Sequence, residues 1–259
     1  MSFRRLAIAF SVSICIIYAG LIVSLFYFFQ GPLFFSVLFS ARTLYSLGLS
    51  VVTATVVTVC SVFFALPSAY ALSRYSYFGK QVIDTLLELP MIVSPVALGA
   101  MILIFLNTPP GQLIQDSAHL IFTIYGILAA QFITTVGVAT RLIKAVFDEI
   151  PRRYEELAWT LGQSDASTFF KVVVPMGKHG IMMSSILTWA KALGEFGATL
   201  TVAGSMAFKT ETVPIAIYMR LSSADIEGTS VLVLILISIG LGVLFGVRLL
   251  ASEKTYMGT

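Results

Sequence analysis

Long apolar runs make up most of the chain, and shorter polar segments separate them. A helix of about 17–25 apolar residues is long enough to cross the hydrocarbon core of a bilayer. By this criterion the runs predict membrane-spanning helices at residues 6–29, 43–66, 89–106, 120–140, 181–203 and 229–250. The pattern therefore predicts an all-α, polytopic membrane protein with about six transmembrane helices, in which residues 1–259 form a single transmembrane domain.

The composition supports lipid as the main solvent of the chain. Of its 259 residues, 58% are apolar and only 11% are charged, and the mean hydropathy is +0.94. A soluble domain typically has about 25% charged residues, so a soluble fold of this chain would lack the polar surface that it needs. The first run, residues 6–29, exceeds the roughly 7–15 apolar residues of a signal peptide, and we expect it to be an uncleaved span.

The basic residues indicate the orientation of the spans, because lysine and arginine concentrate on the cytoplasmic side of a membrane protein. If the N-terminus is cytoplasmic, only Arg42, Lys209 and Arg220 lie outside, and Lys191 lies within a span. We therefore expect a multi-pass protein of the cell membrane with both termini in the cytoplasm. This placement also accounts for the net charge of +3 without a nucleic-acid partner.

Hydroxyl side chains recur on one face of the second span, at Thr43, Ser46, Ser50 and Thr53. Small residues let helix backbones approach closely in lipid. The stripe therefore indicates packing inside the bundle or, alternatively, a hydroxyl-lined substrate path. The sequence by itself leaves both interpretations open.

The longest charged interruption in the apolar pattern is the predicted cytoplasmic loop, about residues 141–179. Pro151 suits the first turn of a helix, and Gly162 can end that helix in a left-handed conformation. Between them, apolar residues recur at the i, i+3, i+4 and i+7 positions of one helical face: Tyr154, Leu157, Ala158 and Leu161. The spacing predicts a short amphipathic helix.

A second short helix is expected to follow, capped by Ser164 or Asp165 and ended by Pro175. Together the two segments predict a helix–turn–helix hairpin at the cytoplasmic surface. Such a hairpin either rests on lipid headgroups or docks a partner, and periodicity alone does not distinguish these roles.

The segment from Glu155 to Gly162 reads EELAWTLG, and Pro175 follows it in the same loop. This pattern resembles the EAA loop of ABC importer permeases, although Leu157 stands where the first alanine of the motif usually lies. In that family the loop supplies a coupling helix that inserts into a groove of the ATP-hydrolysing subunit. The resemblance implies that the residues coupling this chain to an ATPase subunit are Glu155, Glu156, Leu157, Ala158, Leu161, Gly162 and Asp165.

The fifth span contains two charged residues, Lys191 and Glu195. A charge at the centre of a membrane helix costs about 2.5–3.5 kcal/mol. The i,i+4 spacing of the two residues permits an ion pair, and Gly194 and Gly197 flank the glutamate. Three interpretations stay open: a structural ion pair within the bundle or between subunits, a gate or pore-lining element, and a proton relay of a secondary transporter.

The third span is also irregular, because Pro90, Pro95 and Gly99 interrupt it. Irregular backbone at membrane depth is tolerated mainly where it adjoins protein or a cavity. The resemblance to importer permeases makes the third and fifth spans our candidates for lining the translocation pathway and forming its gate. The candidate gate and pathway residues are Pro95, Lys191, Gly194, Glu195 and Gly197.

Residues 189–204, WAKALGEFGATLTVAG, are similar to the corresponding span of molybdate and tungstate permeases and of the related sulfate permeases. Those permeases often have arginine in place of Lys191. The segments 88–99 and 212–218 are similar to them as well. The resemblance implies a MetI-like ABC importer permease bundle for a tetrahedral oxyanion, molybdate or tungstate first and sulfate or thiosulfate as the alternative.

The resemblance also implies the partners of the chain. A second copy of the chain would complete the translocation pathway within the membrane lipid. Two ATP-binding-cassette ATPase subunits would dock on the coupling helices, and an external substrate-binding protein would deliver the anion. ATP-driven closure of the ATPase subunits would then open the pathway outward, by alternating access.

Motifs for enzymatic chemistry are missing from the sequence. Neither the nucleotide-binding pattern G-x-x-x-x-G-K-[ST] nor the metal-binding pattern H-E-x-x-H occurs. His119 and His179 are predicted on opposite sides of the membrane, and Cys15 and Cys60 lie within apolar runs. We therefore expect no catalytic residue, metal or cofactor, and a transport subunit that depends on ATP hydrolysis by a partner. The alternative is an ion-coupled secondary transporter, which would work without ATP.

Overall fold

The computed structural model describes residues 3–28 and 31–256, and every regular element within these ranges is a helix. In chain order the elements are α1 (Phe3–Leu25), η1 (Phe26–Phe28), α2 (Gly31–Leu38), α3 (Ala41–Arg74), α4 (Lys80–Leu86), α5 (Leu89–Ile92), α6 (Pro95–Leu106), α7 (Pro109–Ala118), α8 (Ile124–Glu149), α9 (Arg153–Thr160), α10 (Asp165–Thr168), η2 (Phe169–Val173), α11 (Val174–Leu193), α12 (Gly197–Ala203), α13 (Val213–Ser222) and α14 (Ile226–Tyr256). The prediction of an all-α protein is confirmed.

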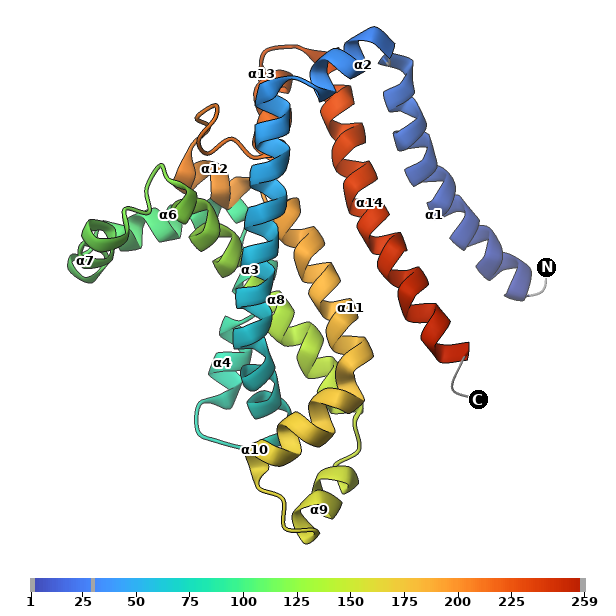
Figure 1. Cartoon of the computed structure of the whole chain (residues 1–259), viewed down its shortest axis with the longest axis vertical. Helices are drawn as coiled ribbons and strands as arrows, with labels where there is room; N and C mark the ends of the chain where they lie inside the picture. The colour runs from blue at the N-terminus through green and yellow to red at the C-terminus, as the bar shows by residue number, and fades with distance from the viewer. Residues whose placement is uncertain (1–2, 29–30, 257–259) are drawn as a thin grey trace.

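The helices form an elongated bundle. Figure 1 shows α3, α8 and α11 running together through its middle, and these three helices pack on one another. α1 and α14 lie along one side, α6, α7 and α12 lie on the other, and α9 forms one tip. The predicted loop helix α9 is therefore separated from most of the apolar bundle.

Four of the described helical segments are long and apolar enough to cross a membrane: Phe3–Phe28, α3, α8 and Ile226–Gly246. They correspond to the first, second, fourth and sixth predicted spans. α3 contains Pro67 and continues to Arg74, beyond the predicted end at residue 66. Because of this extension, the last turn of α3 reaches the tip of the molecule that carries α9.

The third predicted span, residues 89–106, is not a single continuous helix. The predicted irregularity is confirmed, because the segment is broken in two. The segments Lys80–Ile92 and Pro95–Leu106 meet at an angle of 117°. Val93 and Ser94 are extended, and the Ser94 side chain accepts a hydrogen bond from the backbone N–H of Ala97. The residue before a proline disfavours helical backbone, so the helix stops before Pro95 and starts again there.

The fifth predicted span, residues 181–203, begins earlier and is broken near its end. The second hairpin helix does not end at Pro175, because α10, η2 and α11 continue one another. η2 is a π-helical turn, and Pro175 follows it at the second residue of α11. The π-turn interrupts the regular α-helical hydrogen-bond pattern, and the helix continues past the proline. α11 ends at Leu193, and α12 starts again at Gly197.

The core near the α9 tip is built from α3, α8 and η2. Its buried members include alanines that let the backbones approach and larger residues that fill the remaining space: Ala65, Ala69, Tyr70, Ala139, Ile143, Phe147, Ile150, Phe169 and Val173. The hydroxyl stripe of α3 is also buried, at Thr43, Ser46, Ser50 and Thr53. In this structure the stripe therefore packs inside the bundle.

Candidate functional site

The α9 helix ends in the turn that its glycine predicts. Gly162 has a φ of +78°, its N–H donates to the carbonyl of Trp159 at 2.9 Å, and the N–H of Gln163 donates to Ala158 at 3.0 Å. This left-handed turn satisfies carbonyls at the end of the helix. Ser164 then caps α10 by accepting from the N–H of Ser167, so Asp165 is the first helical residue and remains exposed.

The outward side of α9 is apolar and exposed. Leu157 is 59% exposed and Leu161 is 74% exposed, and Glu156 is exposed beside them. Trp159 in α9 and Phe170 in η2 are exposed as well, at 43% and 68%, although neither was among the predicted coupling residues. Their signal in the sequence was the aromatic character of residues in a charged cytoplasmic loop. We call Leu157, Trp159, Leu161 and Phe170 the tip surface.

The inward side of α9 holds two residues that the sequence assigned to the docking face. Ala158 is buried, and Glu155 is 1% exposed. The predicted stripe is therefore divided: Leu157 and Leu161 face outward, whereas Ala158 packs toward the chain's own helices. The carboxylate of Glu155 accepts hydrogen bonds from Tyr70 and Arg74 of α3, so it is not exposed for docking in this structure, and its role in coupling stays a prediction.

A second site forms where the broken third and fifth spans meet. A cavity of about 450 Å³ is lined by Pro95, Val96, Ala190, Lys191, Gly194, Glu195, Phe196 and Gly197. All of the gate and pathway residues predicted from the sequence are among them. The structure thus brings together residues from two spans that are far apart in the chain, and we call this space the break cavity.

The break in the fifth span separates the two charged residues. Lys191 lies in the last turn of α11 and Glu195 lies beyond its end at Leu193. A carboxylate oxygen of Glu195 accepts a hydrogen bond from the N–H of Ala198 at 3.0 Å. Among the described residues no ion pair of Lys191 is formed. The i,i+4 ion pair within one helix is therefore wrong for this structure, because the helix that it requires is interrupted.

Glycines allow the two broken spans to touch. A Cβ atom on Gly197 would lie 2.9 Å from the Cβ of Pro95 and 2.9 Å from the backbone N of Val96. A Cβ atom on Gly99 would lie 2.7 Å from the Cβ of Thr201. α6 and α12 therefore pack backbone to backbone, which the absence of a glycine side chain permits.

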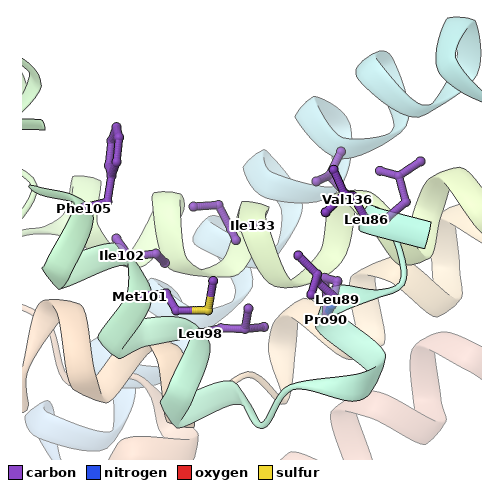
Figure 2. Close-up of a pocket in the computed structure, with 11 residues that line it drawn as sticks. Leu86, Leu89, Pro90, Leu98, Met101, Ile102, Phe105, Ile133 and Val136 are labelled. Carbon is purple, nitrogen blue, oxygen red and sulfur yellow. The ribbon is translucent and has the colours of Figure 1, made fainter. Parts of the chain in front are cut away.

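The bend of the third span encloses a different, apolar pocket. Figure 2 shows side chains of α4, α5 and α6 facing those of α8 across it, among them Leu89, Met101 and Ile133. Its volume is about 300 Å³, and its lining contains no charged or hydroxyl side chain. An anion would be poorly solvated in this pocket, because no side chain in its lining can replace the lost water.

At the opposite end of α3, Glu211 forms an ion pair that the sequence reasoning missed. Arg42 donates from Nε and from Nη2 to its two carboxylate oxygens, each at 2.8 Å, and Glu211 is 1% exposed. Nearby, the Ser50 hydroxyl accepts a hydrogen bond from the N–H of Val213 at 2.8 Å. These bonds hold the segment between α12 and α13 against α3.

The sequence of the chain is similar to those of known transport proteins. Residues 61–255 match the family of binding-protein-dependent transport system inner membrane components. The chain is 34% identical over 204 residues to a probable molybdenum ABC transporter permease of Haloferax volcanii, covering 79% of this chain and 74% of that one. It is 32% identical over 208 residues to the sulfate transport system permease CysT of Salmonella typhimurium, covering 78% and 75%.

A solved structure has the same fold. A bacterial ABC transporter involved in the import of the polysaccharide alginate aligns with a TM-score of 0.76 at 14% identity, covering 97% of this chain and 96% of that one. Permeases of this kind are not catalytic, and ATP hydrolysis takes place on separate ATPase subunits. With its MetI-like helical bundle and its matched residues 61–255, the chain belongs to the ABC importer family of binding-protein-dependent inner membrane permeases.

Proposed function

We propose that the chain forms the translocation pathway for a tetrahedral oxyanion, molybdate or tungstate in the first place. The observation that carries this proposal is Lys191, a cation without an ion-pair partner in the described chain, on the wall of the break cavity. An anion that crosses a membrane loses water, and a nearby cation offsets part of that cost. The similar molybdenum and sulfate permeases support the oxyanion class.

The position of Glu195 favours an anion over a cation as cargo. Its carboxylate is buried and accepts a backbone hydrogen bond, whereas Lys191 is only partly buried beside the cavity. The cation is therefore the more accessible charge of the two. Sulfate or thiosulfate remains the alternative cargo, because these anions offer the same tetrahedral shape and charge to a lysine.

The tip surface is our proposed docking site for an ATPase subunit. Four large apolar side chains, in and next to α9 and in η2, are exposed there, and exposed apolar surface outside the membrane favours a protein partner. Glu156 and Asp165 are exposed around it and could pair with basic groups of a partner. In this proposal Gly162 shapes the end of the docking helix, and two copies of the chain present two such helices to two ATPase subunits.

The proposed orientation places α9 and both termini in the cytoplasm. Figure 1 shows that the N-terminal end of α1 and the C-terminal end of α14 both point toward the end of the molecule that carries α9. This arrangement supports the orientation expected from the basic residues. The segment between α12 and α13 would then face outward, on the side where a binding protein delivers the anion.

Transport by the reconstituted complex tests the proposal. The chain would be purified with its ATPase and binding-protein partners, inserted into liposomes, and supplied with radioactive molybdate in competition with tungstate, sulfate and thiosulfate. We expect ATP-dependent uptake that tungstate inhibits most strongly. Preferential sulfate uptake would reassign the cargo to sulfate. Uptake by the chain alone, driven by a proton or sodium gradient, would instead support the ion-coupled secondary transporter.

A further inference from the structure

Glu155 and Glu156 are neighbours on α9 with the same side chain and opposite surroundings. Glu155 is buried against the bundle, whereas Glu156 is exposed at the tip. With 3.6 residues per turn, successive helical side chains point about 100° apart. One of two adjacent glutamates can therefore face the chain's own helices while the other faces a partner.

Both carboxylate oxygens of Glu155 bond to the last turns of α3. The Tyr70 hydroxyl donates to Oε2 at 2.7 Å, and Arg74 Nε donates to Oε1 at 2.6 Å. The side chain of Arg74 is 7% exposed, so solvent is largely excluded from the ion pair. Charge-assisted hydrogen bonds of this length are strong and directional. The contact therefore sets the position of α9 relative to α3 closely.

The same turn of α3 also holds the segment that leads into α9. Arg74 Nη2 donates to the carbonyl of Ile150 at 2.8 Å. Arg152 bonds in the opposite direction: its Nη2 donates to the carbonyl of Arg74 at 3.1 Å and to the carbonyl of Ser73 at 3.3 Å. Hydrogen bonds thus run in both directions between the end of α3 and the start of α9.

Aromatic packing extends this connection to the rest of the bundle. The ring of Tyr70 lies with its centroid 4.8 Å from that of Phe169 in η2 and 6.2 Å from that of Phe147 in α8. η2 continues into α11, which ends at the break cavity. Close-packed interiors have low compressibility and transmit displacement. A shift at α9 can therefore reach Lys191 through packed helices.

We propose that Glu155 is a positioning residue that locks α9 to α3, so that the two helices move as one body during transport. Glu156 faces the partner and has no part in this lock. The inference rests on the proposed function, because α9 is displaced only when a docked ATPase subunit pulls or pushes it. It assigns different roles to two adjacent glutamates of the coupling motif.

The experiment compares Glu155→Gln with Glu156→Gln in the complete transporter, and the adjacent position serves as the matched control. Two quantities are measured: the amount of ATPase subunit that copurifies with the chain, and the molybdate taken up per ATP hydrolysed. For Glu155→Gln we expect normal copurification and about a tenfold lower uptake per ATP, equivalent to about 1.4 kcal/mol of lost coupling. For Glu156→Gln we expect weaker copurification, because its exposed side chain is available to the partner.

A milder variant keeps the test decisive if Glu155→Gln fails to fold. Tyr70→Phe removes one hydrogen bond to Glu155 and keeps the ring that packs on Phe169, so a folded protein with a lower uptake per ATP supports the proposal. If Glu155→Gln folds and its uptake per ATP equals that of the wild type, the proposal is overturned. If Glu155→Gln does not fold, a wild-type uptake per ATP in Tyr70→Phe overturns it instead. If the wild-type complex itself shows no ATP-driven uptake, the proposed function fails rather than the role of Glu155.

Discussion

Gly197 and Pro95 touch at the start of two different helices, where a Cβ atom on the glycine would lie 2.9 Å from the Cβ of the proline. Pro95 begins α6 and Gly197 begins α12, so each broken span restarts at the point where it meets the other. The break before α6 and the break before α12 are therefore in contact with each other. Under the proposed function, this contact is where we expect the pathway to change shape.

Gly197→Ala should destabilise the protein and reduce transport, because the added methyl group would collide with Pro95 and with the backbone of Val96. Overpacking of a tight contact typically costs about 1–3 kcal/mol. Thermal unfolding in detergent and uptake in liposomes would measure the two effects. Gly48→Ala in α3 is the matched control, since a Cβ atom there would have no atom within 4 Å and Gly48 does not line the break cavity. Equal behaviour of the two variants would argue against the tight contact.

Lys191→Met should abolish most anion uptake, whereas Lys191→Arg should retain it. Two unit charges about 4 Å apart attract by about 4 kcal/mol at an effective dielectric constant of about 20. Even a third of this energy corresponds to roughly a tenfold change in rate. Initial uptake rates at saturating binding protein would measure the loss. Full activity of the methionine variant would remove Lys191 from the proposed anion path.

Leu161→Ser should weaken docking of the ATPase subunit. Burying a leucine side chain completely stabilises a folded protein or complex by about 1.5–3 kcal/mol. Leu161 is 74% exposed in the isolated chain, so a partner can bury it. Leu113→Ser on α7 is the control, because Leu113 is 73% exposed but lies far from α9 in the bundle. The amount of copurified ATPase would report the difference. Similar losses from both variants would show that the effect is not specific to the tip surface.

Arg42→Gln should destabilise the segment between α12 and α13, because it leaves the buried carboxylate of Glu211 without its cation. A hydrogen bond to a charged group contributes about 1.5–3 kcal/mol to the free energy of unfolding. Because the Arg42 side chain is half exposed, we expect a loss of stability at the lower end of this range. Hydrogen exchange of residues 204–212 would detect the loosening. Arg42→Gln combined with Glu211→Gln should be less destabilising than the sum of the two single variants. Additive effects would contradict the coupling.

Several features of the fold were predictable because their causes are local. Apolar length located most of the spans, since the thickness of a bilayer sets the length of a helix that crosses it. The end of α9 at Gly162 was predictable because a left-handed residue favours glycine. The break before Pro95 was foreseen as an irregularity for a similar reason, although its angle of 117° was not.

Other features depended on contacts between distant segments. The spacing of Lys191 and Glu195 suggested an ion pair, but the helix ends between them and the glutamate bonds to Ala198 instead. Pro175 suggested the end of a helix, but the π-turn before it lets α10 and α11 continue one another. The buried role of Glu211 was missed because nothing near it in sequence indicated its pairing with Arg42.

The sequence by itself determined a helical membrane protein with an amphipathic cytoplasmic segment, irregular third and fifth spans, and the residues around their breaks. Only the tertiary structure decided that these breaks meet in one cavity, and that Glu155 faces α3 while Glu156 faces outward. The physical reason is that periodicity and backbone preferences act over a few residues. Which surface covers a helical face depends on helices that are far apart in the chain and pack together only in the folded protein.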